Sequence, residues 1–185
     1  MKLLSLSLVF LFVSNFTHAQ DTIPSAESIL KDAYKQAAAE NKNVFVIFHA
    51  SWCGWCRKMD NAMNDPSCKK AFAENYVIVH LTVEESKDKK DLENPGADLV
   101  KNKYLGEKAG LPFWLILDKN GKLLADSYKR KPGVKKDQPG ENIGCPTSED
   151  EIAFFTDILQ RTSSLSDSKL STIAKRFKKN KQTIN

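Results

Sequence analysis

Two cysteines lie three positions apart in the segment Trp52-Cys53-Gly54-Trp55-Cys56. Side chains at positions i and i+3 face each other on the first turn of a helix, so the two sulfur atoms can lie close enough to bond. The segment follows a short run of apolar and β-branched residues that is typical of a buried strand, and the residues after it have helical spacing. The pattern therefore predicts reversible thiol–disulfide chemistry at a point where a strand ends and a helix begins.

The two thiols are predicted to take different parts in that chemistry. Cys53 would lie at the helix N-terminus, where the macrodipole and unpaired amide N–H groups favour the thiolate and can lower a cysteine pKa from about 8.5 to between about 3.5 and 7.5. We expect Cys53 to be the exposed nucleophile, and Cys56, one turn further along and more buried, to be the thiol that resolves the mixed disulfide. Gly54 would let a partner backbone approach closely, while Trp52 and Trp55 would supply a flat apolar surface suited to extended polypeptide.

A closely spaced cysteine pair can also attach haem, bind a metal ion or form a structural disulfide. A c-type haem attachment site is excluded because Arg57, and not histidine, follows Cys56. A structural zinc site requires four ligands, and Cys68 and Cys145 do not form a second closely spaced pair. Copper(I) held by the two thiolates and Met59 stays open, since soft ligands suit that ion. A purely structural disulfide is poorly motivated, because so short a loop gains little chain entropy. We expect neither a bound metal nor another cofactor.

The first residues predict export from the cytoplasm. Lys2 precedes an apolar run over residues 3–13, and polar residues then lead to Thr17-His18-Ala19, which suits cleavage after Ala19. The apolar run is too short to cross a bilayer as a helix, which needs about twenty residues, so a cleaved signal peptide is predicted and not an anchor. We expect a periplasmic or secreted protein with a signal peptide at 1–19, one domain at 20–162 and a basic helix or tail at 163–185.

Charge is distributed unevenly along the chain. The formal net charge is +5, and residues 163–185 alone contain six basic residues and one acidic residue. Such a segment could contact an acidic partner or a membrane surface, but a solvated helix that keeps the chain soluble is the favoured interpretation. We expect no nucleic-acid partner.

The apolar pattern predicts a globular chain of alternating helices and strands. Hydrophobic residues make up 41% of the chain, which is typical of a packed core and not of a disordered chain. Helices are predicted at 25–40, 57–64, 67–75, 95–107, 148–160 and 165–177, and strands at 44–49, 76–83, 113–117 and 123–128. The first two strands are joined by helices and the last two by a hairpin turn at residues 118–121. Residues 129–142 are predicted to be a loop. This order indicates a mixed sheet covered by helices, in the α/β class.

Two of the predicted helices carry further signals. The helix at 95–107 is predicted to place Leu99, Val100 and Tyr104 on one side. The helix that begins after Ser148 has a glutamate at position 151, which fits a capping box.

The segment from Val44 to Met59 resembles the active-site segment of the thioredoxin superfamily. A second motif, at residues 110–113, resembles that family's cis-proline loop, which faces the dithiol. The break at Asp65-Pro66, followed by a predicted helix and strand, resembles the exported bacterial thioredoxin-like and thiol:disulfide interchange branch. The resemblance covers residues 25–161. It implies a thioredoxin-like fold with a mixed four-stranded sheet flanked by helices, to which an N-terminal helix and a C-terminal basic helix are added.

The same resemblance implies a substrate site. The Leu111–Pro112 bond would be cis, and the loop would present the main chain of Leu111 to a bound peptide as a strand-like edge. The substrate-binding residues implied in this way are Trp52, Gly54, Trp55, Leu111 and Pro112.

Several positions depart from the family's pattern. Thioredoxin has a buried acidic residue six positions before the first cysteine as proton acceptor for the second, whereas this chain has Ile47 there. His80 stands on the next strand where the family often has lysine, and a neutral histidine can exchange protons near pH 7, so His80 is the replacement candidate and Glu84 a weaker one. A half-buried strand histidine with no role is the alternative for His80. The Gly54-Trp55 dipeptide also differs from that of thioredoxin, so the direction of catalysis stays open.

The remaining cysteines allow two interpretations. Cys68 and Cys145 could form a structural disulfide, which export permits, or could be two buried free thiols. Each lies beside an apolar element, and we therefore expect free thiols.

Together these features predict a thiol–disulfide oxidoreductase that acts on protein or peptide disulfides in an exported compartment. A reductase or electron relay is favoured, with a membrane thiol relay as the candidate electron partner. An isomerase usually works as a dimer, and no added dimerisation domain is apparent, so we expect a monomer. The alternatives are a redox-inert peptide-binding thioredoxin-like module and a copper-handling protein.

Overall fold

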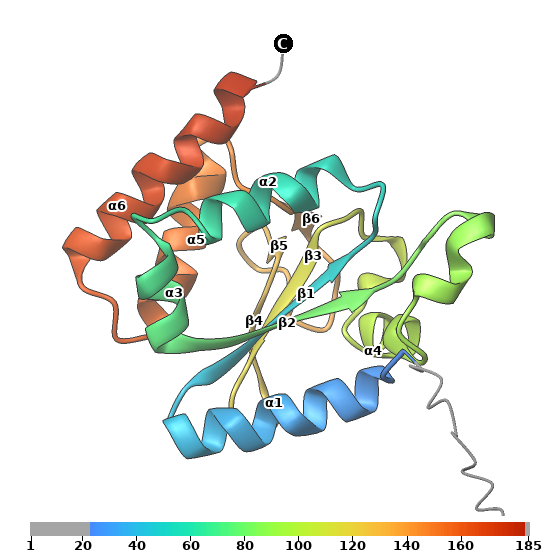
Figure 1. Ribbon diagram of the computed structural model, residues 1–185. Coiled ribbons are helices and arrows are strands. Elements are labelled where there is room, and N and C mark those ends of the chain that lie inside the picture. The colour runs from blue at the N-terminus through green and yellow to red at the C-terminus, as the bar shows by residue number, and fades with distance from the viewer. Residues whose placement is uncertain (1–22, 184–185) are drawn as a thin grey trace, which may run out of the picture.

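The structure is a computed structural model that describes residues 23–183; the predicted signal peptide lies outside the described residues. Its centre is a four-stranded sheet in the order β2-β1-β3-β4 (Figure 1). The strands are β1 (Asn43–His49), β2 (Tyr76–Thr82), β3 (Phe113–Leu117) and β4 (Leu123–Asp126). β1 runs parallel to β2 and antiparallel to β3, and β4 pairs antiparallel with β3. The predicted mixed sheet of the α/β class is confirmed.

Helices cover both faces of this sheet, and Figure 1 shows α1 on one side with α2, α5 and α6 on the other. The α-helices are α1 (Ala26–Glu40), α2 (Gly54–Met63), α3 (Lys69–Asn75), α4 (Ala97–Lys103), α5 (Glu149–Thr162) and α6 (Asp167–Lys178). Short 3-10 helices lie at η1 (Lys87–Leu92), η2 (Gly106–Lys108) and η3 (Lys179–Thr183). No helix within residues 23–183 is long and apolar enough to cross a membrane.

The central strand β1 is buried on both faces because each face meets a separate core. Phe45 and Ile47 pack with residues of α2, α3, α5 and α6, while Val44, Val46 and Phe48 pack with residues of α1 and α4. Successive side chains of a strand point to opposite faces, so a strand between two cores must be apolar at every position. This explains the continuous apolar run and gives β1 a rigid position from which the chain enters α2.

Side-chain caps mark the starts of two helices that were predicted from the sequence. The hydroxyl of Ser25 accepts a hydrogen bond from the Ser28 N–H at the start of α1. At the start of α5, Ser148 and Glu151 form the predicted capping box, in which each side chain bonds the other residue's main-chain N–H.

The segment at 129–142 was predicted to be a loop, and this prediction was incomplete. It contains most of a small second sheet in which β5 (Tyr128–Lys129) pairs antiparallel with β6 (Glu141–Asn142). Two-residue strands are too short to show the period-two alternation by which a strand is recognised. The pairing matters because it brings Asn142 beside the loop that precedes β3.

The C-terminal helix α6 belongs to the main core. Leu170, Ile173 and Phe177 are buried there, and the rings of Phe155 and Phe177 lie 5.0 Å apart between centroids. Arg176 of the same helix donates a hydrogen bond of 2.7 Å to Asp65, next to the break between α2 and α3. The basic segment is therefore amphipathic, with its apolar side packed on the domain.

Candidate functional site

Cys53 and Cys56 are joined by a disulfide, with their Cα atoms 5.3 Å apart. Cys53 is the N-cap of α2, and its sulfur accepts a hydrogen bond of 3.1 Å from the main-chain N–H of Cys56. One of the N–H groups that a helix leaves unpaired at its start is therefore directed at this sulfur. The same N–H would stabilise negative charge on Cys53 once the disulfide is reduced.

Both cysteines are buried in this disulfide-bonded form. Each is only 2% exposed, so the predicted exposure of Cys53 and the predicted difference between the two thiols are not observed. The physical reason is that Ala50 and Leu111 pack against the pair in a small apolar cluster.

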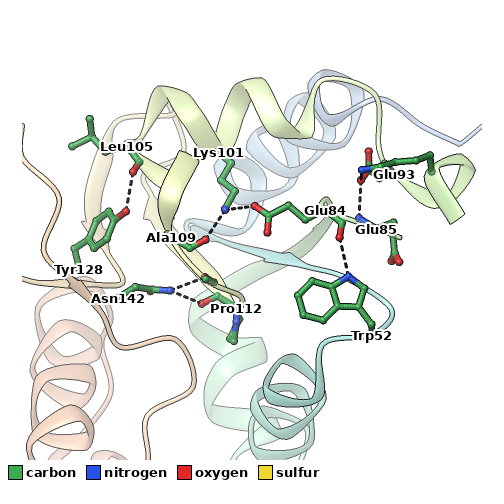
Figure 2. Close-up of polar contacts among 12 residues, drawn as sticks. Trp52, Glu84, Glu85, Glu93, Lys101, Leu105, Ala109, Pro112, Tyr128 and Asn142 are labelled. Atoms are coloured by element: carbon green, nitrogen blue, oxygen red, sulfur yellow. Dashed lines mark hydrogen bonds and ion pairs between the residues drawn. The ribbon is translucent and has the colours of Figure 1, made fainter. Parts of the chain in front are cut away.

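The two tryptophans of the motif lie exposed around the disulfide. Trp52 is 55% and Trp55 40% exposed, whereas large apolar side chains are more often buried. The indole Nε1 of Trp52 donates a hydrogen bond of 2.8 Å to the main-chain carbonyl of Glu84, as Figure 2 shows. The ammonium of Lys58 lies 4.4 Å from the centre of the Trp55 ring, a cation–π distance. Each tryptophan is thus held in place although its ring faces solvent.

The loop that precedes β3 carries the second predicted motif. Its Leu111–Pro112 peptide bond is cis. The amide of Asn142 donates hydrogen bonds to the carbonyl of Gly110 at 2.7 Å and to that of Pro112 at 3.3 Å (Figure 2). Within residues 23–183, the main chain of Leu111 makes no hydrogen bond. The loop is therefore held at the residues on either side of Leu111, and the polar groups of Leu111 itself stay free to bond a ligand.

Cavities lie on both sides of this loop. One of about 290 Å³ is bounded by Trp55, Pro112 and Cys145. The other, of about 410 Å³, is bounded by Ala109 and Tyr128. Gly110 and Asn142 line both, so the two cavities adjoin the cis-proline loop, and Trp55 brings the first of them next to the dithiol motif.

The structure places the two candidate proton acceptors in different surroundings. His80 lies on β2 opposite Ile47 of β1, and its Nε2 is 2.8 Å from the Asp60 carboxylate of α2. The ring of His49 packs edge-on to His80, and burial, followed by the charge of His80, lowers the pKa of His49. The carboxylate of Glu84 is bonded to Lys101. Each candidate has a polar partner, and proton exchange with Cys56 stays a prediction for both.

Three residues that build the site were missed in the sequence. Glu85 binds Ser51 beside the cysteines, Lys101 binds Glu84 and Ala109, and Asn142 holds the cis-proline loop. Leu99 was predicted on the apolar side of α4, but it is 69% exposed, and Lys101 is buried instead. Ala97, four residues before Lys101, was the available signal, because residues at i and i+4 share a helix face.

Cys68 and Cys145 are free, buried thiols, so the predicted alternative of a second disulfide is excluded. Burial raises the pKa of Cys145 to about 12, and its sulfur accepts a hydrogen bond from the amide of Asn180. Burial also raises the pKa of Cys68. Both thiols are therefore protonated at neutral pH. Among the residues that the structure describes, no group of three or more His, Cys, Asp or Glu side chains is placed to hold a metal ion.

One protein family and several solved structures are similar to this chain. A thioredoxin-like family matches residues 25–119. A disulphide isomerase from Xylella fastidiosa is similar in structure, with a TM-score of 0.45 and 18% identity over 60% of this chain and 77% of that chain. A thioredoxin from Thermus thermophilus aligns with a TM-score of 0.43 and 18% identity over 70% and 81% of the two chains. The C-terminal domain of Neisseria meningitidis DsbD aligns with a TM-score of 0.43 and 17% identity over 75% and 98%. The family match spans the disulfide, strands β1 to β3 and the cis-proline loop, and the chain belongs to the thioredoxin-like family.

Proposed function

We propose that this protein is a thiol–disulfide oxidoreductase that acts on disulfides of proteins or peptides. The observation that carries the proposal is the Cys53–Cys56 disulfide at the first turn of α2, with the Cys56 N–H directed at the Cys53 sulfur. A pair joined across a single helical turn can open and close with little movement of the backbone. The N–H group and the helix macrodipole favour Cys53 as the thiolate that attacks.

In the reducing direction, the reaction starts from the dithiol. The Cys53 thiolate attacks one sulfur of the substrate disulfide, forming a mixed disulfide and releasing the other substrate sulfur as a thiolate. The Cys56 thiol then loses its proton and attacks the Cys53 sulfur, which releases the second substrate thiolate. Two electrons have passed to the substrate, whose two sulfurs take up protons, and Cys53 and Cys56 are joined as in this structure.

The surroundings of the disulfide suit an extended polypeptide. The free main-chain groups of Leu111 could pair with a peptide strand, as an exposed sheet edge does. Trp52 and Trp55 supply exposed rings on the other side, and Gly54 adds no side chain between them. We infer that Pro112 and its neighbours hold the residues that flank the substrate cysteine, with side chains entering the hollows beside the loop.

The predicted signal peptide supports an exported, periplasmic or secreted site of action. There the disulfide left after each reducing cycle must be reduced again by a partner, for which a membrane thiol relay is the class we propose. We favour a monomeric reductase or relay over an isomerase.

Trapping of the intermediate tests the proposal. In Cys56→Ser the mixed disulfide with a disulfide-containing polypeptide should accumulate and be visible on a non-reducing gel. Cys53→Ser should give none, and Cys68→Ala, which alters a buried thiol outside the motif, should behave as the wild type does.

A second measurement, titration of Cys53/Cys56 against glutathione or dithiothreitol, should give a potential near roughly −270 mV for a reductase and near roughly −120 mV for an oxidant. A pair that does not titrate reversibly would overturn the proposal in favour of a redox-inert peptide-binding module.

A further inference from the structure

Lys101 is a buried cation that connects the loop after β2 with the loop that leads to the cis-proline. Its side chain, on α4, is only 2% exposed. The ammonium donates one hydrogen bond of 2.5 Å to the carboxylate of Glu84 and another of 2.8 Å to the carbonyl of Ala109, as Figure 2 shows. A buried ammonium is costly unless it is paired and hydrogen-bonded, so these two contacts define where the charge can lie.

The two partners lead to two parts of the proposed substrate site, Trp52 and the cis-proline loop. The main-chain carbonyl of Glu84 accepts a hydrogen bond from the indole N–H of Trp52. The carboxylate of the same residue is bound to Lys101. Ala109 begins the loop that continues through Leu111 to Pro112. One ammonium therefore connects the residue that holds Trp52 with the loop that carries the cis-proline, without contacting either cysteine.

The backbone at Glu84 and Gly106 restricts the position of the Lys101 side chain. Glu84 has a φ of 56°, in the left-handed region that residues with a Cβ rarely adopt, and such a conformation persists only where the surroundings hold it. Its neighbour Glu85 donates its main-chain N–H to the carboxylate of Glu93 at 2.7 Å, which fixes the turn from the other side. The stem of Lys101 packs so closely on Gly106 that a Cβ there would lie 2.6 Å from its Cγ. The methylene chain of Lys101 is therefore as restricted in position as its ammonium group.

We propose that Lys101 is a positioning residue that sets the separation between Trp52 and the Leu111–Pro112 loop, and so selects extended polypeptide as the substrate. This inference rests on the proposed oxidoreductase function. Lys101 acts through Glu84 and Ala109, so its removal should weaken the binding of a polypeptide that contacts both parts of the site. A small disulfide that touches only the reacting sulfur should not be affected.

The test compares two substrates in Lys101→Met, which keeps the length of the side chain and removes its charge. The variant leaves the Glu84 carboxylate without its cation, but that side chain is 44% exposed and can be solvated, so the variant is expected to fold. For a disulfide-containing polypeptide we expect KM to rise about tenfold with little change in kcat, which corresponds to ~1.4 kcal/mol of lost binding. For 5,5′-dithiobis(2-nitrobenzoate), the rate of reaction with the reduced protein should stay within about twofold of the wild type. Lys103→Met, an exposed lysine on the same helix, is the matched control and should change neither.

Glu84→Gln provides a second variant on the same connection. It keeps a hydrogen-bond acceptor for Lys101 but removes the charge, and it should raise the polypeptide KM in the same direction by a smaller factor. If Lys101→Met does not fold, Glu84→Gln decides the question alone. An equal loss with both substrates would show that Lys101 acts on the sulfurs, and an unchanged KM would show a purely structural residue; either result overturns the inference. A wild-type protein that reduces neither substrate would instead contradict the proposed function itself.

Discussion

The carboxylate of Glu85 accepts two hydrogen bonds from Ser51, one from its main-chain N–H at 2.5 Å and one from its hydroxyl at 2.8 Å. Glu85 is buried, and Arg57 of α2 binds the carbonyl of the same serine at 2.9 Å. Every polar group of Ser51 is thus held by a side chain from elsewhere in the chain. Because Ser51 lies two residues before Cys53, the turn from β1 into the motif has little freedom.

Removal of this carboxylate should destabilise the fold. Glu85→Ala removes the charged acceptor of both Ser51 hydrogen bonds, and we expect the free energy of unfolding to fall by about 1–3 kcal/mol in urea denaturation. Glu85→Gln keeps one acceptor and should lose less. Glu107→Ala, at an exposed glutamate, is the control, and an equal loss in the control and in Glu85→Ala would contradict the assigned role.

The four thiols of the reduced protein should differ widely in reactivity. We expect iodoacetamide at pH 7 to modify Cys53 first, because the thiolate is the reactive form and the helix N-terminus stabilises it. Cys68 and Cys145 have pKa values raised by burial and should react only after unfolding. Mass spectrometry of the peptides after short labelling times measures the order. Labelling of Cys145 in the folded protein as fast as Cys53 would show that the cavity beside Trp55 opens to reagents.

The contact between Asp65 and α6 should make stability depend on pH in the acid range. Hydrogen bonds from Ser67, together with the guanidinium of Arg176, lower the pKa of Asp65 to about 2. The unfolded carboxyl has a pKa of about 3.9, so the folded state keeps the charge to lower pH. The stabilisation is therefore complete above about pH 5 and is lost as the pH falls through 4 towards 2.

Urea denaturation of the wild type and of Asp65→Asn at a series of pH values tests this dependence. The difference in unfolding free energy between them should be largest near pH 6 and should shrink towards pH 2. In an Arg176→Met background the same difference should be smaller at every pH. A difference that stays constant from pH 6 to pH 2 would contradict the assignment.

Proton exchange by His80 can be tested at the step in which Cys56 resolves the mixed disulfide. If the imidazole accepts the proton of Cys56, His80→Gln should slow that step roughly tenfold or more near pH 7 and flatten its pH dependence, as expected for loss of a general base. Asp60→Asn keeps the imidazole and removes only its carboxylate partner, so it should slow the step less than His80→Gln does. Rapid-quench measurement of the mixed disulfide gives the rate. An unchanged profile in His80→Gln would leave this histidine a half-buried strand residue.

The features that could be predicted from the sequence depend on neighbours along the chain. Three features can be recognised within a few residues of sequence: the apolar run of β1, the first turn of α2 and the capping box of Ser148. Lys101 could not be found in this way, because its burial depends on Glu84 and on Ala109, which a helix pattern does not connect. A lysine in a helix is ordinarily assigned to the solvent side.

The burial of Cys53 was missed for a related reason. Position at a helix N-terminus indicates the electrostatic surroundings of a thiol, but its exposure depends on what the rest of the chain lays over it. Here Leu111 covers the pair, and it comes from a loop 58 positions further along the chain. Asn142 is a comparable case, because the two-residue pairing of β5 with β6 is what places it beside that loop.

The packing of α6 limits how the protein can be shortened or fused. The stretch matched by the thioredoxin-like family ends at residue 119, yet Trp114 and Ile116 of β3 share a core with Phe155 and Phe177. A fragment cut at the end of the family match would expose that apolar face to water, and exposed apolar surface of this kind promotes aggregation. The smallest piece that could be moved intact into another protein therefore extends through Asn180, whose amide reaches Cys145 at the edge of the cavity beside the disulfide.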